Sequence, residues 1–215
     1  MAVGDLGKDL VSEAASSAVP GMGALVGRLW EGMTREWETN RSIALRAAQE
    51  ISGLSREDLA ERIDSYPELV PALTRVLWEA AMTGRTKLLE SMGAVFGAAI
   101  DDLEHLPDYE MVLTGLSSLT GTDILVLKEA RDRHVFHQQT DDEITAESNE
   151  AATVLGIADR LNLAKASVAF GLRRLENQGF VSSMSVLGGT RFTITELGLL
   201  LYDVLERMAD FHDEA

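Results

Sequence analysis

The chain has 215 residues, and its 46% hydrophobic and 25% charged residues are typical of a globular protein with one large or two small domains. It contains no cysteine, which excludes disulfide bridges and thiolate chemistry and fits a cytoplasmic protein. The formal net charge of −16 argues against nonspecific binding to a polyanion.

The N-terminal region has neither a signal-peptide pattern nor an apolar segment long enough for a bilayer, so no membrane association is expected. A short helix is predicted over residues 4–18. A long helix follows over residues 24–51, because its apolar residues recur at spacings of three and four. We expect this stripe to lie in the hydrophobic core or at a dimer interface. Alternatively, its two tryptophans line a ligand pocket. The stripe consists of Val26, Trp30, Met33, Trp37, Ala44, Ala47 and Ile51.

Further helices are predicted up to residue 119. Ser55 is the N-cap of the first, with Asp58 three residues later. The helices span residues 56–65, 67–83, 86–103 and 107–119. No strand pattern appears in this part, so residues 1–119 are predicted to form an all-helical domain for dimerisation or sensing. This half is vaguely similar to helical domains of uncharacterised bacterial and phage proteins, and the similarity implies no activity.

The chain beyond residue 119 mixes helix and strand signals. Thr122-Asp123 is predicted to cap a helix from Ile124 to about Arg133. Residues 134–149 are polar and acidic and are predicted to form a loop, with room for a short strand around Ile144. A helix over residues 151–161 follows.

Residues 157–178 are predicted to form a helix, a short turn and a second helix. Val168, Leu172 and Leu175 recur at spacings of four and three, so the second helix buries one stripe. Gly179 suits the left-handed position after its last turn.

Two runs of strand-forming residues, 180–186 and 191–195, flank Gly188-Gly189, which is a hairpin signal. A helix pair followed by a hairpin makes a winged helix. An amphipathic helix over residues 196–211 ends the pattern, and it either joins a dimer interface or packs on its own bundle.

About the last 90 residues resemble the DNA-binding module of MarR-type bacterial regulators. The resemblance rests on Ile157-Ala158, on the turn at Asn162-Leu163, on the segment 175–181 (LENQGFV), and on Arg191 with the run 194–198 (ITELG). It implies a winged helix over residues 120–215. With the N-terminal helical bundle predicted from the helix patterns, the fold class is expected to be mainly α. The resemblance also implies a transcriptional regulator that binds double-stranded DNA as a homodimer.

The positive charge is concentrated between Arg160 and Thr195, where five basic residues accompany one acid. Charges are screened beyond about 8 Å at physiological salt, so this local excess outweighs the global sum. The second helix would enter the major groove, and Arg191 would contact the flanking backbone or minor groove. The residues predicted to contact DNA are Lys165, Ser167, Ala169, Phe170, Arg173, Arg174 and Arg191.

Two positions depart from the family pattern. Ala164 replaces the usual serine or threonine cap, and Phe170 stands where an arginine is common. Alternatively, then, Arg173 and Arg174 form a solvated face, and Phe170 contacts a protein or belongs to the core. The second hypothesis is a non-catalytic interaction module, related to phage or defence, whose winged helix holds a protein partner.

Catalytic motifs are missing from the sequence. It has no nucleotide-binding loop and no Gly-x-Ser-x-Gly elbow. His134 and His137 are three residues apart, but they lack a second ligand pair and are interpreted as solvated loop histidines. We therefore expect no enzyme, no metal and no cofactor.

Overall fold

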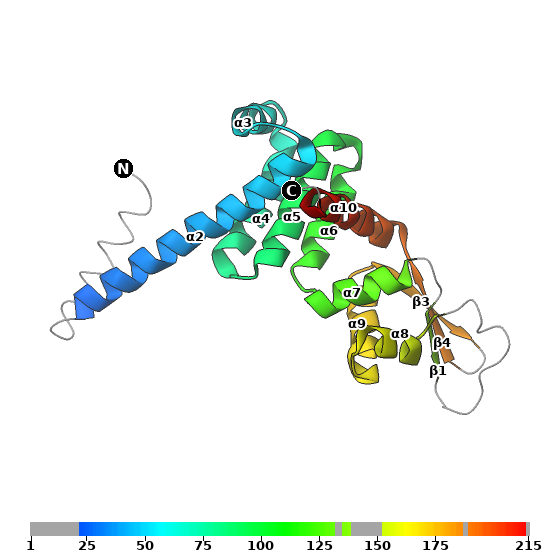
Figure 1. Ribbon diagram of the computed structural model, residues 1–215. Helices are drawn as coiled ribbons and strands as arrows, with labels where there is room; N and C mark the ends of the chain where they lie inside the picture. The colour runs from blue at the N-terminus through cyan, green and yellow to red at the C-terminus, as the bar shows by residue number, and fades with distance from the viewer. Residues whose placement is uncertain (1–21, 132–134, 139–151, 187–188, 214–215) are drawn as a thin grey trace.

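The computed structural model describes residues 22–131, 135–138, 152–186 and 189–213. The chain is mainly helical, with a small β-sheet beside the last helices (Figure 1). The helix predicted over residues 4–18 lies outside the described residues. The helices are α2 Met22–Ser52, α3 Arg56–Ser65, α4 Val70–Met82, α5 Thr86–Asp101, α6 Leu106–Leu116, α7 Gly121–Ala130, α8 Val154–Leu161, α9 Lys165–Asn177 and α10 Glu196–Asp213, with short 3-10 turns at Pro67–Leu69 and Leu103–His105.

The contact between α2 and α5 is the centre of the helical bundle. Every residue of α5 from Ser91 to Ile100 is buried. A Cβ atom added to Gly93 would overlap the carbonyl oxygen of Ala44, and one added to Gly97 would lie 2.5 Å from the carbonyl oxygen of Ala48. Glycine at both positions therefore lets the two backbones approach within a distance that other residues forbid.

Polar side chains fix the helix ends around this core. Asn40 on α2 is buried, and its Nδ2 donates to the carbonyl oxygens of Ala80 at 3.1 Å and Thr83 at 2.9 Å. These bonds use carbonyls that the C-terminus of α4 leaves unpaired. Ser55 caps α3 as predicted, because its Oγ accepts from the backbone N–H of Asp58 at 3.1 Å.

Helix α7 begins earlier than predicted, and the expected cap at Thr122-Asp123 is wrong. Thr120 is the N-cap, and its Oγ1 accepts from the N–H of Asp123 at 3.3 Å. Asp123 Oδ2 in turn accepts from the N–H of Thr120 at 2.7 Å, which completes a capping box. The helix ends at Ala130, short of the predicted Arg133.

The sheet contains two strands, β1 and β2, that the sequence did not reveal. Its strands are β1 Val135–Gln138, β2 Ala152–Thr153, β3 Val181–Val186 and β4 Gly189–Ile194, in the order β2-β1-β4-β3. Strands β3 and β4 form the predicted antiparallel hairpin, and β1 pairs antiparallel with the other edge of β4. Residues 135–138 were expected in a loop. They form a strand because β4 provides hydrogen-bond partners for their backbone N–H and C=O groups. The predicted strand position at Ile144 lies outside the described residues.

Helix α8 starts at Val154, not at the predicted residue 151, since Ala152 and Thr153 pair with β1. Thr153 then caps the helix, with its Oγ1 accepting from the N–H of Gly156 at 2.9 Å.

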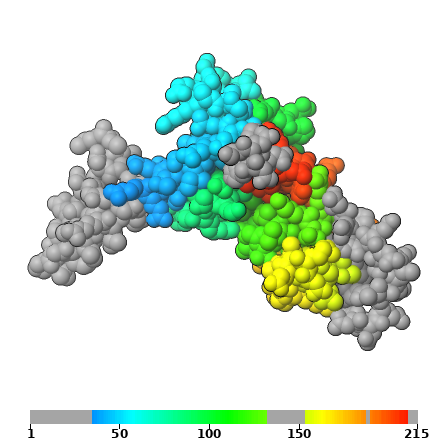
Figure 2. Space-filling model, in the orientation of Figure 1, coloured from blue at the N-terminus to red at the C-terminus, as the bar shows by residue number. Residues whose placement is uncertain are grey.

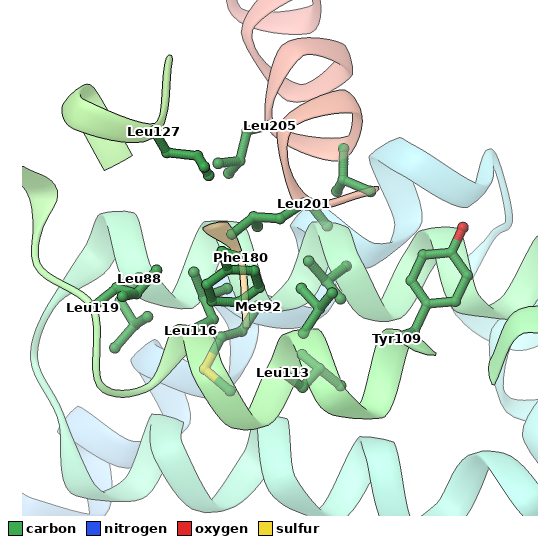
Figure 3. Close-up of a cluster of buried hydrophobic side chains, with 14 of the residues drawn as sticks. Leu88, Met92, Tyr109, Leu113, Leu116, Leu119, Leu127, Phe180, Leu201 and Leu205 are labelled. Carbon is green, nitrogen blue, oxygen red and sulfur yellow. The ribbon is translucent and has the colours of Figure 1, made fainter. Parts of the chain in front are cut away.

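One hydrophobic core runs across the predicted boundary between residues 119 and 120. Helix α10 packs on α5 and α6, and its Leu201, Val204 and Leu205 are buried. Phe180, from the segment before β3, lies with Met92 and Leu116 of the bundle (Figure 3). Of the two alternatives for the last helix, packing on its own bundle is observed, and a dimer contact by its outer side stays a prediction.

An exposed histidine at the start of α6 supplies a pH test. His105 Nδ1 lies 3.0 Å from both carboxylate oxygens of Asp102, and this hydrogen bond raises the pKa of His105 above its usual 6.5. A raised folded-state pKa gives stability that is fully present below pH 6.5 and is lost as the pH rises through the folded-state value. We expect Asp102→Asn to return the His105 pKa towards normal in an NMR titration. An unchanged His105 pKa in this variant would contradict the assignment.

Candidate nucleic-acid interface

The turn between α8 and α9 fixes the direction of α9. Asn162 has the left-handed φ of 52°, and the N–H of Leu163 donates to the carbonyl oxygen of Ala158 at 2.8 Å. Helix α9 then begins at Lys165. Ala164 occupies the N-cap without a side-chain hydrogen bond, so the cap residue offers no side-chain acceptor to the first N–H groups of α9.

The buried side of α9 agrees with the prediction. Val168, Leu172 and Leu175 are each 0% exposed, and Gly179 has the left-handed φ of 79° that ends the helix. Gly171 lies on the same buried side, and a Cβ there would lie 3.0 Å from Asp123 Oδ1 on α7. The close approach of α7 and α9 that Gly171 permits therefore brings the Asp123 carboxylate to the surface of α9.

The outer face of α9 is formed by Ala166, Phe170 and Arg173, which recur at four and three residues and are all exposed. Phe170 is 66% exposed, so the alternative that it belongs to the core is wrong. Lys165, Ser167 and Ala169 are half-buried at its margins. This face belongs to the α8–α9 surface, which stands at the end of the molecule away from α3 (Figure 2).

Arg174 does not share the environment of Arg173. Its Nε and Nη2 donate to the two carboxylate oxygens of Asp123 at 2.9 and 2.7 Å. Asp123 is completely buried, and its hydrogen bond raises the pKa of Arg174 further above the ordinary value. The two-point contact attaches α9 to α7 and neutralises the charge of Arg174.

Arg173 makes a weaker, exposed ion pair. Its Nη1 lies 2.6 Å from Glu176 Oε2 one turn along the helix, and its guanidinium stands 5.2 Å from the centre of the Phe192 ring. A hydrogen bond from Ser183, together with Arg173, lowers the pKa of Glu176. Exposed ion pairs at this spacing contribute little to stability, so a phosphate oxygen can replace Glu176 as the partner of Arg173.

Arg191 lies on β4, opposite Met184 of β3 and Phe136 of β1 in the strand register. It is half-buried and forms no ion pair with a described residue. It is therefore placed on the hairpin, as predicted, while Lys165 and Arg173 lie on α9.

The local charge excess is smaller in three dimensions than along the sequence. Arg160 Nη2 lies 2.7 Å from Glu129 Oε2, and Arg174 pairs with Asp123, so acids from α7 offset both arginines. Neither acid falls between residues 160 and 195. Thr120 and Asp123 signal a helix cap in the sequence, but nothing in a pattern connects Asp123 to an arginine 51 residues away.

A metal centre does not emerge from the described residues. They contain no group of three or more His, Asp or Glu side chains placed to hold a metal ion. His134 lies outside them, and His137 belongs to β1, not to the predicted loop. Among the described helices, none has both the length and the apolar character needed to cross a bilayer.

The chain was compared with protein-family models, with curated proteins and with solved structures, and it matches none of them.

Proposed function

We propose that residues 120–215 form a winged helix and that the protein is a cytoplasmic DNA-binding regulator. The observation that carries this proposal is the open outer face of α9. This helix is the second of a turn-linked pair, it is followed directly by a hairpin, and the described residues leave Ala166, Phe170 and Arg173 uncovered. The proposal assigns no catalytic activity and no cofactor.

In this proposal α9 enters the major groove. Lys165 and the uncapped N–H groups approach a phosphate, where the positive end of the helix dipole favours an anion. Ala169 and Phe170 offer apolar contact to thymine methyl groups, and Ser167 offers a hydrogen bond. Arg173 exchanges Glu176 for a phosphate oxygen, and Arg191 contacts the flanking backbone or minor groove. Arg174 holds α9 in position through Asp123.

A homodimer is part of the proposal. One module presents few cations, and two modules double them. The first turns of α2 extend beyond the other described helices (Figure 1), which leaves a length of helix for contact with a second copy.

The test compares two double variants with the same change of net charge. Arg173→Ala with Arg191→Ala removes two proposed phosphate contacts, so the slope of log affinity against log salt should fall by about 2. Arg35→Ala with Arg75→Ala removes two exposed arginines of α2 and α4 and should leave the slope unchanged. Fluorescence anisotropy on duplexes obtained by binding-site selection measures both. Equal slopes for the two variants, or no duplex bound by the wild type at low salt, would refute DNA binding.

A second candidate function is protein binding through the same surface. It is favoured by the exposure of three large apolar side chains on neighbouring elements: Leu155 of α8 at 53%, Phe170 of α9 at 66% and Met184 of β3 at 61%. The pairing of Arg173 and Arg174 with acids also favours it. Such a module, related to phage or defence, would hold a partner without catalysis.

Phe170→Ala and Trp78→Ala distinguish this candidate, because both side chains are 66% exposed and they lie on different helices. Protein binding predicts a partner that copurifies with the wild type and Trp78→Ala but is lost with Phe170→Ala, while no duplex binds at low salt. A partner retained equally by both variants would exclude α9 as its contact surface.

A further inference from the structure

A groove of about 500 Å³ is lined by residues of α2 and α3. Helix α3 lies on the opposite side of the molecule from α9 (Figure 1). The basic residues that line the groove are Arg41 and Arg46 of α2 and Arg56 at the start of α3. All three side chains are exposed at the groove. The fold thus gathers three guanidinium groups in one place on a chain whose net charge is −16.

These arginines differ from most others in the described part of the chain. Arg160 and Arg174 pair with carboxylates, and Arg207 donates to the carbonyl oxygen of Ile51 at 3.1 Å. Arg41, Arg46 and Arg56 form no ion pair or hydrogen bond with any described residue. Neighbouring like charges repel each other, and a bound anion would relieve that repulsion.

The groove also has an apolar floor. Leu59 of α3 is 4% exposed and Leu45 of α2 is half-buried, and both line the groove. Glu38 is the one carboxylate among the described lining residues. A simple anion would need only the arginines, whereas a groove of this volume fits an organic molecule that covers the leucines as well.

We propose that the groove binds a small organic phosphate. The planar guanidinium groups of Arg41, Arg46 and Arg56 match phosphate oxygens with paired N–H donors. Leu45 and Leu59 cover an apolar or planar part of the same molecule, and Glu38 accepts a hydrogen bond from its hydroxyl or amino group. This site is independent of the DNA-binding surface, so either proposal can fail without the other.

The test is calorimetric titration of the full chain with inorganic phosphate and with adenosine monophosphate. We expect both to bind and the nucleotide to bind more tightly. Arg41→Ala with Arg56→Ala should weaken binding at least about tenfold, because two charge-assisted hydrogen-bond donors are lost. Arg35→Ala with Arg75→Ala carries the same change in net charge outside the groove and should bind like the wild type. Equal melting temperatures of the two variants show that folding is intact.

A flotation assay identifies the source of the phosphate. It uses phosphatidylcholine vesicles with and without phosphatidylglycerol. Flotation that requires phosphatidylglycerol and is lost with Arg41→Ala and Arg56→Ala assigns the groove to a lipid headgroup, while binding of the soluble probes alone assigns it to a free metabolite. The proposal is overturned if phosphate, nucleotide and vesicles all fail to bind, or if the groove variant and its control lose binding equally.

Discussion

Gly93→Ala is expected to lower the free energy of unfolding by about 3 kcal/mol, at the upper end of the usual cost of overpacking. The new Cβ would overlap the carbonyl oxygen of Ala44, and its next contacts are also backbone atoms of α2. A flexible side chain could rotate away, but backbone cannot, so α2 and α5 must separate. Urea unfolding followed by circular dichroism measures the loss.

Gly121→Ala is the matched control, because no heavy atom lies within 4 Å of a Cβ at this position and its φ is not positive. Gly121 is the first residue of α7, where alanine is a better helix former. We expect stability to stay equal or rise by up to about 1 kcal/mol. A similar loss of stability in Gly93→Ala and Gly121→Ala would show that the close approach of α2 and α5 does not depend on glycine at position 93.

Arg174→Ala is expected to cost about 3 kcal/mol of stability, because it leaves the carboxylate of Asp123 buried without its cationic partner. This estimate takes the low end of the range for a broken buried pair, since the Arg174 side chain is 42% exposed and solvent screens the pair. Arg173→Ala removes the neighbouring arginine and should cost less than about 1 kcal/mol, because its pair with Glu176 is exposed. Chemical denaturation of both variants measures the difference. Equal losses would contradict the anchoring role of Arg174.

Arg174→Lys tests whether Arg174 attaches α9 to α7 or contacts a DNA phosphate directly. Lysine keeps the positive charge but cannot donate two parallel hydrogen bonds to Asp123. If Arg174 positions α9, both the stability and the DNA affinity of Arg174→Lys should stay below those of the wild type. Wild-type DNA affinity in Arg174→Lys, together with reduced stability, would instead mean that Arg174 contacts DNA as a charge.

Local patterns in the sequence predicted most helices to within a few residues. The N-cap at Ser55, the buried stripe of α9 and the left-handed Gly179 depend only on nearby residues, and all three are confirmed. The residues of the candidate surface were also placed on α9 and on the hairpin, as expected from the same patterns.

The features that were missed depend on distant residues. Strand β1 is four residues long and exists because it pairs with β4, which begins 51 residues after its end. The pairing of Arg174 with Asp123 likewise joins two helices that no periodicity connects. Counting charge between residues 160 and 195 therefore overestimated the positive surface, since acids from α7 fold against it.

The position of α10 also has a consequence for biosynthesis. Leu201 and Leu205 reach the bundle formed by residues translated much earlier, next to Leu127 and Phe180 (Figure 3). Until residues 196–213 have left the ribosome, the surface of α5 and α6 that α10 covers stays exposed to water. Final closure must therefore wait until synthesis has passed α10, and a ribosome that stalls before it would hold an aggregation-prone intermediate.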